Sequence, residues 1–188
     1  MALTKTKPLE LGFSAPQFKL KDTISGKIMG LEDIRGEKAT LVMFICNHCP
    51  YVIHVRPELI RLANDFKGRG VGFIAISSND AERYPEDSPE KMGELGRELQ
   101  FPFPYLYDET QEVAKAYDAV CTPDFALFDS KLKCVYRGRL DGSRPGNDVP
   151  VSGADIRRAI ETVIAGKEID WPTEPSMGCS IKWKTGNE

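Results

Sequence analysis

Two cysteines separated by two residues, in the stretch FICNHCPYV at positions 44–52, constrain this chain more than any other feature. The apolar run ATLVMFI at 39–45 leads into them and is typical of a strand buried on both faces of a sheet. From Pro50 to Lys67, apolar residues recur at helical spacing, which predicts a helix that Pro57 should kink. The cysteine pair therefore lies at a predicted strand-to-helix junction.

The rest of the chain predicts an α/β fold. We expect a hairpin at Phe18–Leu20 and Lys27–Met29, a second buried strand at 71–77, and a second hairpin formed by FALFD and CVYRGR. We expect a helical turn at 31–36 and helices at 88–100 and 111–117. A last helix should begin at Ser152 and Asp155 and end at Gly166. A right-handed crossover between the two buried strands then gives a mixed central sheet with helices on both faces. We expect one domain over 1–188, with irregular termini at about 1–12 and 168–188.

Charge and hydropathy exclude several classes of partner. The net charge of -3 provides no basic surface for nucleic acid or acidic lipid. The longest apolar run, Leu41–Cys46, is far too short to span a membrane, and the first ten residues lack the apolar segment of a signal peptide. We therefore expect a cytoplasmic protein. There thiols are kept reduced, and an odd number of cysteines, five, also argues against a disulfide framework.

The position of the cysteine pair favours redox chemistry. Unpaired N–H groups at a helix N-terminus stabilise an anion, and the thiolate is the nucleophile in disulfide exchange. We expect Cys46, nearer the exposed turn, to be an accessible thiolate and Cys49 to be the resolving thiol. Asn47 and His48 lie between them as supporting residues, and a protonated His48 adds positive charge.

Four further motifs follow CNHCPY in order: YPEDSPE, PFPYLYDETQEVAKAY, CTPDF and GCSIKWK. With them the chain resembles the thioredoxin-like superfamily, and more narrowly its cytosolic thioredoxin/peroxiredoxin-like (redoxin, AhpC/TSA-type) family, from about Phe13 to Lys184. The resemblance implies a thioredoxin-like fold with an N-terminal hairpin extension. It also implies that Thr122-Pro123 is a cis-proline loop beside the dithiol. His48 is similar to the histidine of strongly oxidising relatives, which implies a potential more oxidising than that of thioredoxin.

The sequence departs from the patterns of both thioredoxins and peroxiredoxins. Ile45 replaces the tryptophan of thioredoxin. The Pro-x-x-x-Thr-x-x-Cys motif of peroxiredoxins is not matched: counting back from Cys49 finds Cys46 and Val42, and counting back from Cys46 finds Met43 and Ala39. These residues favour a thiol–disulfide oxidoreductase. An antioxidant thiol peroxidase that reduces hydroperoxides, with Cys49 or Cys46 attacking, remains an alternative.

Several other residues are candidates for the functional site, and the sequence allows two roles for each of them. Cys121 is an extra resolving thiol or a small buried residue, and Asp124 is a proton acceptor or a loop anchor. Tyr51 covers the dithiol or packs in the core. Asn79 and Asp80, at the same edge of the sheet, contact a substrate or form a turn. A role for Cys179 in the redox cycle stays open.

A metal-binding module is a further alternative. A zinc site needs a second pair of ligands, whereas two thiols and a histidine suit Cu(I). We expect no metal and no cofactor. The expected partners are protein or small-molecule thiols and disulfides, hydroperoxides in the second reading, and a thioredoxin-type reductant. The electron donor, the potential and the oligomeric state stay open.

Overall fold

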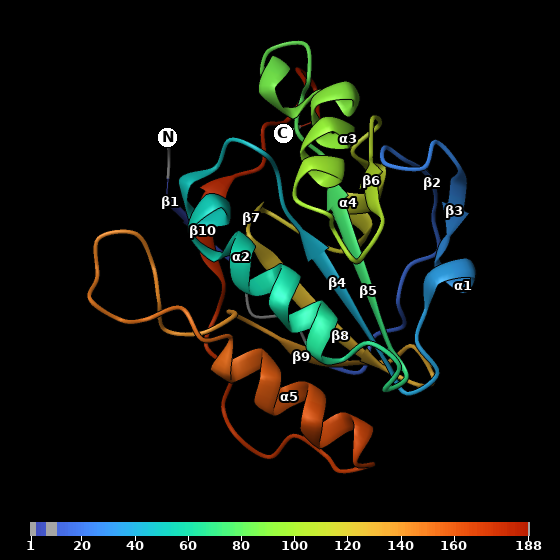
Figure 1. Cartoon of the computed structure of the whole chain (residues 1–188), viewed down its shortest axis with the longest axis vertical. Coiled ribbons are helices and arrows are strands. Elements are labelled where there is room, and N and C mark those ends of the chain that lie inside the picture. The colour runs from blue at the N-terminus through green and yellow to red at the C-terminus, as the bar shows by residue number, and fades with distance from the viewer. Residues whose placement is uncertain (1–2, 7–10, 188) are drawn as a thin grey trace.

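A seven-stranded mixed sheet organises the computed structural model, which describes residues 3–6 and 11–187 (Figure 1). Its order is β3-β2-β6-β5-β4-β8-β9. The strands are β2 (Lys19–Asp22), β3 (Ile28–Gly30), β4 (Ala39–Phe44), β5 (Val71–Ser77), β6 (Tyr105–Tyr107), β8 (Asp124–Asp129) and β9 (Cys134–Arg137). Strands β4, β5 and β6 run parallel, and the other pairings are antiparallel. The predicted mixed sheet, its crossover and both hairpins are confirmed.

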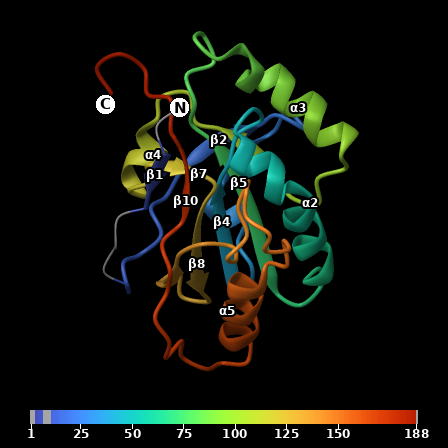
Figure 2. The same cartoon turned by 90° about the vertical axis from the view of Figure 1, so that its left-hand side faces the viewer.

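Helices cover both faces of this sheet, as predicted (Figure 2). They are α1 (Leu31–Ile34), α2 (Pro50–Asp65), α3 (Pro89–Glu98), α4 (Glu112–Ala116) and α5 (Ala154–Ile164), with a 3-10 turn η1 (Pro85–Asp87) before α3. Alternate residues of β4 point to opposite faces. Leu41 and Met43 join the core under α2, α3 and α5, whereas Val42 and Phe44 join the core under α1 and α4.

A second, three-stranded sheet of order β1-β10-β7 lies beside the dithiol edge of the first. It consists of β1 (Leu3–Lys5), β10 (Met177–Ser180) and β7 (Cys121–Thr122). The prediction of irregular termini is therefore wrong for residues 3–5 and 177–180, while residues 1–2, 7–10 and 188 lie outside the described part. These strands escape sequence reasoning because each has at most four residues and pairs with a segment distant in the chain.

Two local features also differ from expectation. Strand β6 is absent from the expectation, because its three residues directly follow two prolines, Pro102 and Pro104, and are too few to show alternation. Helix α5 begins after Gly153 rather than at a Ser152 cap, because the Asp141 carboxylate accepts hydrogen bonds from the amides of Ser152 (2.7 Å) and Gly153 (2.6 Å). Among the described residues, no helix combines the length and apolarity needed to cross a bilayer.

Candidate active site

The dithiol occupies the loop between β4 and α2. Strand β4 ends at Phe44, Cys49 is the N-cap residue of α2, and Pro50 is its first residue. Proline suits this place because its missing N–H would have no partner within the helix. The predicted strand-to-helix junction is confirmed, with the second cysteine rather than the first at the helix end.

Both sulfur atoms lie against Thr122 of β7. Sγ of Cys46 is 3.5 Å from the Thr122 hydroxyl, and in its thiol form Cys49 donates to the Thr122 carbonyl at 3.2 Å. The Thr122–Pro123 peptide bond is cis. The loop that the resemblance implied therefore does stand beside the dithiol.

The ionisation of the pair differs from the prediction. The hydrogen bond from Cys46 lowers the pKa of Cys49 to about 4 against the cost of burial, and Cys179 and the Val52 amide add to the effect. The same hydrogen bond, burial and the nearby Asp87 carboxylate raise the pKa of Cys46 well above its usual value. The prediction of an accessible Cys46 thiolate is wrong, since Cys46 is 2% exposed and Cys49 is 0% exposed. The field of a helix is strongest at its end, and Cys49 is the N-cap residue of α2, whereas Cys46 lies three residues before it.

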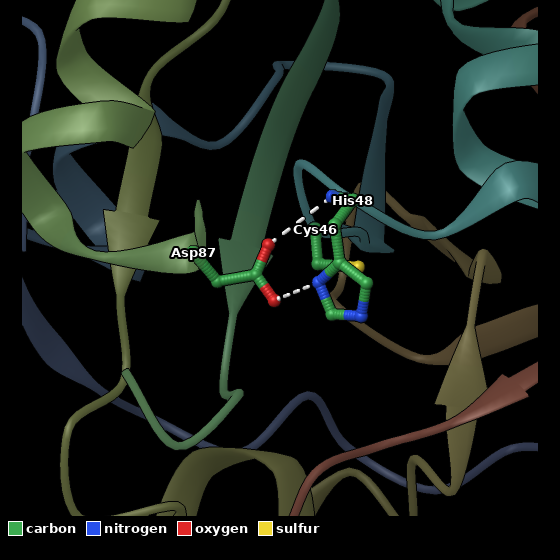
Figure 3. Close-up of side chains that lie close together, drawn as sticks. All are labelled: Cys46, His48 and Asp87. Atoms are coloured by element: carbon green, nitrogen blue, oxygen red, sulfur yellow. Dashed lines mark hydrogen bonds and ion pairs between the residues drawn. The ribbon is translucent and has the colours of Figure 1, made fainter. Parts of the chain in front are cut away.

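Asp87, at the end of η1, anchors the dithiol loop and was missed by sequence reasoning. One carboxylate oxygen accepts from the amides of Asn47 (2.8 Å) and His48 (3.3 Å). The other accepts from Nδ1 of His48 (2.6 Å) and the side-chain amide of Asn79 (2.7 Å). Figure 3 shows the carboxylate facing His48, with Cys46 behind the imidazole ring. The motif YPEDSPE contains Asp87, but nothing in its local pattern identifies a long-range anchor.

The two residues between the cysteines hold the loop in place. The His48 ring stacks on Tyr84, with centroids 5.6 Å apart and planes at 4°. The Asn47 carbonyl accepts from Arg56 (2.6 Å), and its side-chain oxygen accepts from the Tyr105 hydroxyl (3.1 Å). Asn47 and His48, the two predicted supporting residues, are therefore each held by contacts to other elements of the fold.

Asn79 and Asp80 are both buried, so of their two readings the structure favours the turn over a substrate contact. Asn79 donates to Asp87 and accepts from the Lys182 amide (2.9 Å), so its side chain braces the loop. Asp80 accepts from the amide of Glu82 (3.1 Å) within its own turn. These positions lie at the expected edge of the sheet but point inward.

Cys121 and Asp124 form a separate buried cluster with Thr6 and Arg137. Asp124 pairs with Arg137 (2.5 Å) and accepts from the Thr6 hydroxyl (3.0 Å), and burial raises the pKa of Asp124. The Cys121 sulfur lies 3.6 Å from the same hydroxyl, and burial raises the pKa of Cys121 to about 12. Of their two readings, the structure favours the anchor for Asp124 and the buried residue for Cys121.

A groove adjoins the cis-proline. Its cavity of about 240 Å³ is lined by residues that include Tyr51, His54, Pro123, Arg139, Ser143 and Met177. Tyr51 thus reaches the groove from the first turn of α2, and His54 is fixed there by a 2.7 Å hydrogen bond between its Nε2 and the Ser143 hydroxyl. The groove gives the dithiol edge a concave surface of mixed polarity.

The cysteine pair at the start of α2 faces a cis-proline, and the sequence that forms this arrangement matches a known protein family. The sequence model of the AhpC/TSA family matches residues 11–137. The chain belongs to the AhpC/TSA family. The matched segment of this AhpC/TSA protein contains the dithiol, Asp87 and the cis-proline loop, and the family resemblance is confirmed.

Solved structures and a curated relative agree with this membership. An uncharacterised conserved protein of Geobacillus kaustophilus is 58% identical, with a TM-score of 0.96 over 98% of this chain and 97% of its own. The thioredoxin domain of a thiol-disulfide oxidoreductase from Bacteroides vulgatus is 22% identical, with a TM-score of 0.64 over 84% of this AhpC/TSA chain and 99% of its own, which shows the thioredoxin-like fold. A candidate peroxiredoxin of Mycobacterium tuberculosis is 28% identical over 117 residues, or 62% of this chain and 69% of that protein.

Proposed function

We propose that this AhpC/TSA-family protein is a thiol–disulfide oxidoreductase that uses Cys46 and Cys49 as its redox dithiol. The observation that carries the proposal is the placement of both sulfur atoms against Thr122, next to the cis-peptide bond and the groove. Such a loop supplies backbone groups beside the reacting sulfur atoms, and the groove supplies space for a partner.

The dithiol shares one proton between two sulfur atoms. In the reduced state Cys49 holds the negative charge and accepts the hydrogen bond of Cys46. We assign the attack to Cys46, because its proton can pass to the Cys49 thiolate that accepts its hydrogen bond, and Cys49 is then the resolving thiol. As Cys46 bonds to one sulfur of a partner disulfide, its proton passes to Cys49 and the other partner sulfur leaves as a thiolate.

The second step releases the partner. Cys49 bonds to Cys46 and its proton passes to the departed thiolate, while the bond between Cys46 and the partner breaks. One disulfide is consumed and one is formed, so the partner leaves as two reduced sulfurs and the protein as a Cys46–Cys49 disulfide. A thioredoxin-type reductant in the cytoplasm, the location that we propose, then restores the dithiol.

Reduction of insulin disulfides by dithiothreitol, followed as turbidity, tests this proposal. The wild-type protein should accelerate the reaction, and both Cys46→Ser and Cys49→Ser should abolish the acceleration. Cys134→Ala is the matched control, because Cys134 lies in the core on the other face of the sheet. Undiminished acceleration by Cys46→Ser removes the proposal.

A thiol peroxidase is the second candidate, and the low pKa of Cys49 favours it. A thiolate is the species that peroxide oxidises, and Cys49 is ionised at neutral pH. Peroxide converts Cys49 to a sulfenic acid, and Cys46 condenses with it to a disulfide with loss of water. The test is the rate of Cys49 oxidation by hydrogen peroxide. A rate no greater than that of the cysteine thiolate in solution excludes this function.

The geometry gives no support to the metal-binding alternative. Donor atoms of Cys46, His48 and Asp87 do lie within 4.8 Å of one another. However, a carboxylate has about four acceptor positions, and Asp87 already accepts four hydrogen bonds. A metal ligated by Asp87 would have to displace one of these donors, so we propose no metal site.

A further inference from the structure

The register of the small sheet places a third cysteine on the dithiol side. In the antiparallel pair β10–β7, Cys179 stands opposite Thr122 and Ser180 stands opposite Cys121. Residues directly opposite one another point to the same face, and neighbours along a strand point to opposite faces. Cys179 therefore shares the face of the Thr122 side chain, which contacts Cys46, whereas Cys121 points to the other face.

The contacts agree with the register. The thiol of Cys179 interacts with that of Cys49, and both belong to the same buried cluster as Cys46. Cys121 instead meets Thr6 on the far side of β7. Cys49 therefore interacts with both other thiols, those of Cys46 and Cys179.

Gly178 sets how closely this third cysteine approaches. A Cβ atom at Gly178 would lie 1.9 Å from the carbonyl oxygen of Thr122, so no other residue fits there without moving the backbone. The same carbonyl oxygen is the hydrogen-bond acceptor of Cys49. The glycine thus brings β10, and with it Cys179, against the residue on which the dithiol rests.

We propose that Cys179 is a third redox cysteine, which moves the disulfide from Cys46–Cys49 to Cys49–Cys179 and releases Cys46 as a thiol. The proposal rests on the dithiol function proposed above. The sulfur of Cys179 bonds to that of Cys49 while the Cys46–Cys49 bond breaks, and the proton of Cys179 ends on Cys46. One disulfide exists before and after the step, so no further oxidant is needed.

Oxidation of Cys46 and Cys49 to a disulfide makes the Cys179 thiolate easier to form, which favours this exchange. In the reduced protein, burial and then the hydrogen bond and charge of Cys49 raise the pKa of Cys179 to about 12. In the Cys46–Cys49 disulfide Cys49 carries no charge, so two of these three causes vanish and Lys182 still favours the thiolate. The exchange leaves the disulfide buried, with Cys179 only 5% exposed, and leaves a reduced Cys46 beside the cis-proline.

Peptide mapping after oxidation by oxidised glutathione and alkylation of the remaining thiols tests the proposal. In the wild-type protein the Cys46–Cys49 disulfide forms first, and Cys179 should then exchange into it, so that the map contains a Cys49–Cys179 disulfide and an alkylated Cys46. In Cys179→Ser the oxidised protein should hold only Cys46–Cys49, with about tenfold less alkylated Cys46 among oxidised molecules. Cys121→Ser is the matched control, and its map should equal that of the wild-type protein.

The wild-type protein separates the two proposals and does not depend on the folding of a variant. After oxidation and acid quenching, its map should contain both Cys46–Cys49 and Cys49–Cys179 disulfides. If Cys46–Cys49 forms but Cys179 is alkylated as a thiol in all of the oxidised protein, the role of Cys179 is overturned alone. If the wild-type protein forms neither a Cys46–Cys49 nor a Cys49–Cys179 disulfide, the dithiol function itself fails.

Discussion

Nδ1 of His48 lies 2.6 Å from a carboxylate oxygen of Asp87, a residue 39 positions further along the chain. The Asp87 side chain is fully buried, whereas that of His48 is 19% exposed. A carboxylate only accepts hydrogen bonds, so Nδ1 is the donor nitrogen of this pair. The loop that carries the dithiol is therefore oriented by η1, a segment outside the strand and helix that flank it.

Asp87→Asn should destabilise the protein by about 3 kcal/mol, because the neutral amide has one acceptor oxygen for four donors. Urea unfolding of the reduced protein measures the change as a lower midpoint with an unchanged slope. Glu82→Gln, an exposed carboxylate in the preceding turn, should leave the midpoint in place. Equal midpoints for the two variants would show that Asp87 does not anchor the loop.

Titration of the reduced protein should reveal one thiolate across the neutral range. Because the pKa of Cys49 is lowered to about 4, its thiolate is present above that pH and is lost as the pH falls through it. Thiolate absorbance near 240 nm measures this, with Cys49→Ser as the blank. In Cys46→Ala the largest cause of the low pKa is absent, so the midpoint should move up. A midpoint that is the same in both proteins would contradict a shared proton.

His48→Phe should make the protein more reducing by about 30 mV, which is a tenfold change in its two-electron equilibrium. Phenylalanine keeps a flat ring next to Tyr84 but donates no hydrogen bond to Asp87, so the Asp87 charge is less compensated and disfavours the thiolate form of the dithiol more strongly. Equilibration with glutathione redox buffers measures the potential. His54→Phe, the same change at a residue bonded to Ser143 in the groove, is the control and should leave the potential where it is. A potential unchanged by His48→Phe would remove His48 as a tuning residue.

Gly178→Ala should lower the free energy of unfolding by at least about 2 kcal/mol and slow disulfide exchange. The added methyl group meets the Thr122 carbonyl and has to push β10 away from β7. Gly142→Ala, whose Cβ meets its neighbours at ordinary contact distances of 3.8 Å and more, is the matched control. Unfolding curves and the insulin assay measure both effects. Wild-type values for Gly178→Ala would mean that the close approach of the two strands is not needed.

The sheet was predictable where the sequence pattern is local. The continuous apolar runs of β4 and β5 and the helical spacing of α2 identify the crossover. Strands β1, β6, β7 and β10 have two to four residues each, too few to show alternation, and they exist through pairing with distant segments. Contacts of that kind leave no periodic signal in the chain.

The site was predictable in outline but not in its electrostatics. Cys46, Cys49 and the cis Thr122–Pro123 bond meet where expected. The prediction that Cys46 carries the negative charge is wrong, because the helix begins at Pro50 and the hydrogen bond from Cys46 stabilises the thiolate of Cys49. Asp87 reaches the loop only through the folded sheet edge, so its role depends on tertiary structure that the sequence pattern does not display.

Strand β10 is the last element of the described fold in chain order, and it pairs with the strand that carries the cis-proline loop. Because a ribosome makes the N-terminal part of a chain first, β4, α2 and the dithiol emerge well before β10. Until β10 leaves the exit tunnel, the loop beside the two cysteines lacks its neighbouring strand. The working arrangement of this protein is therefore completed only after a segment more than a hundred residues beyond the dithiol has been made.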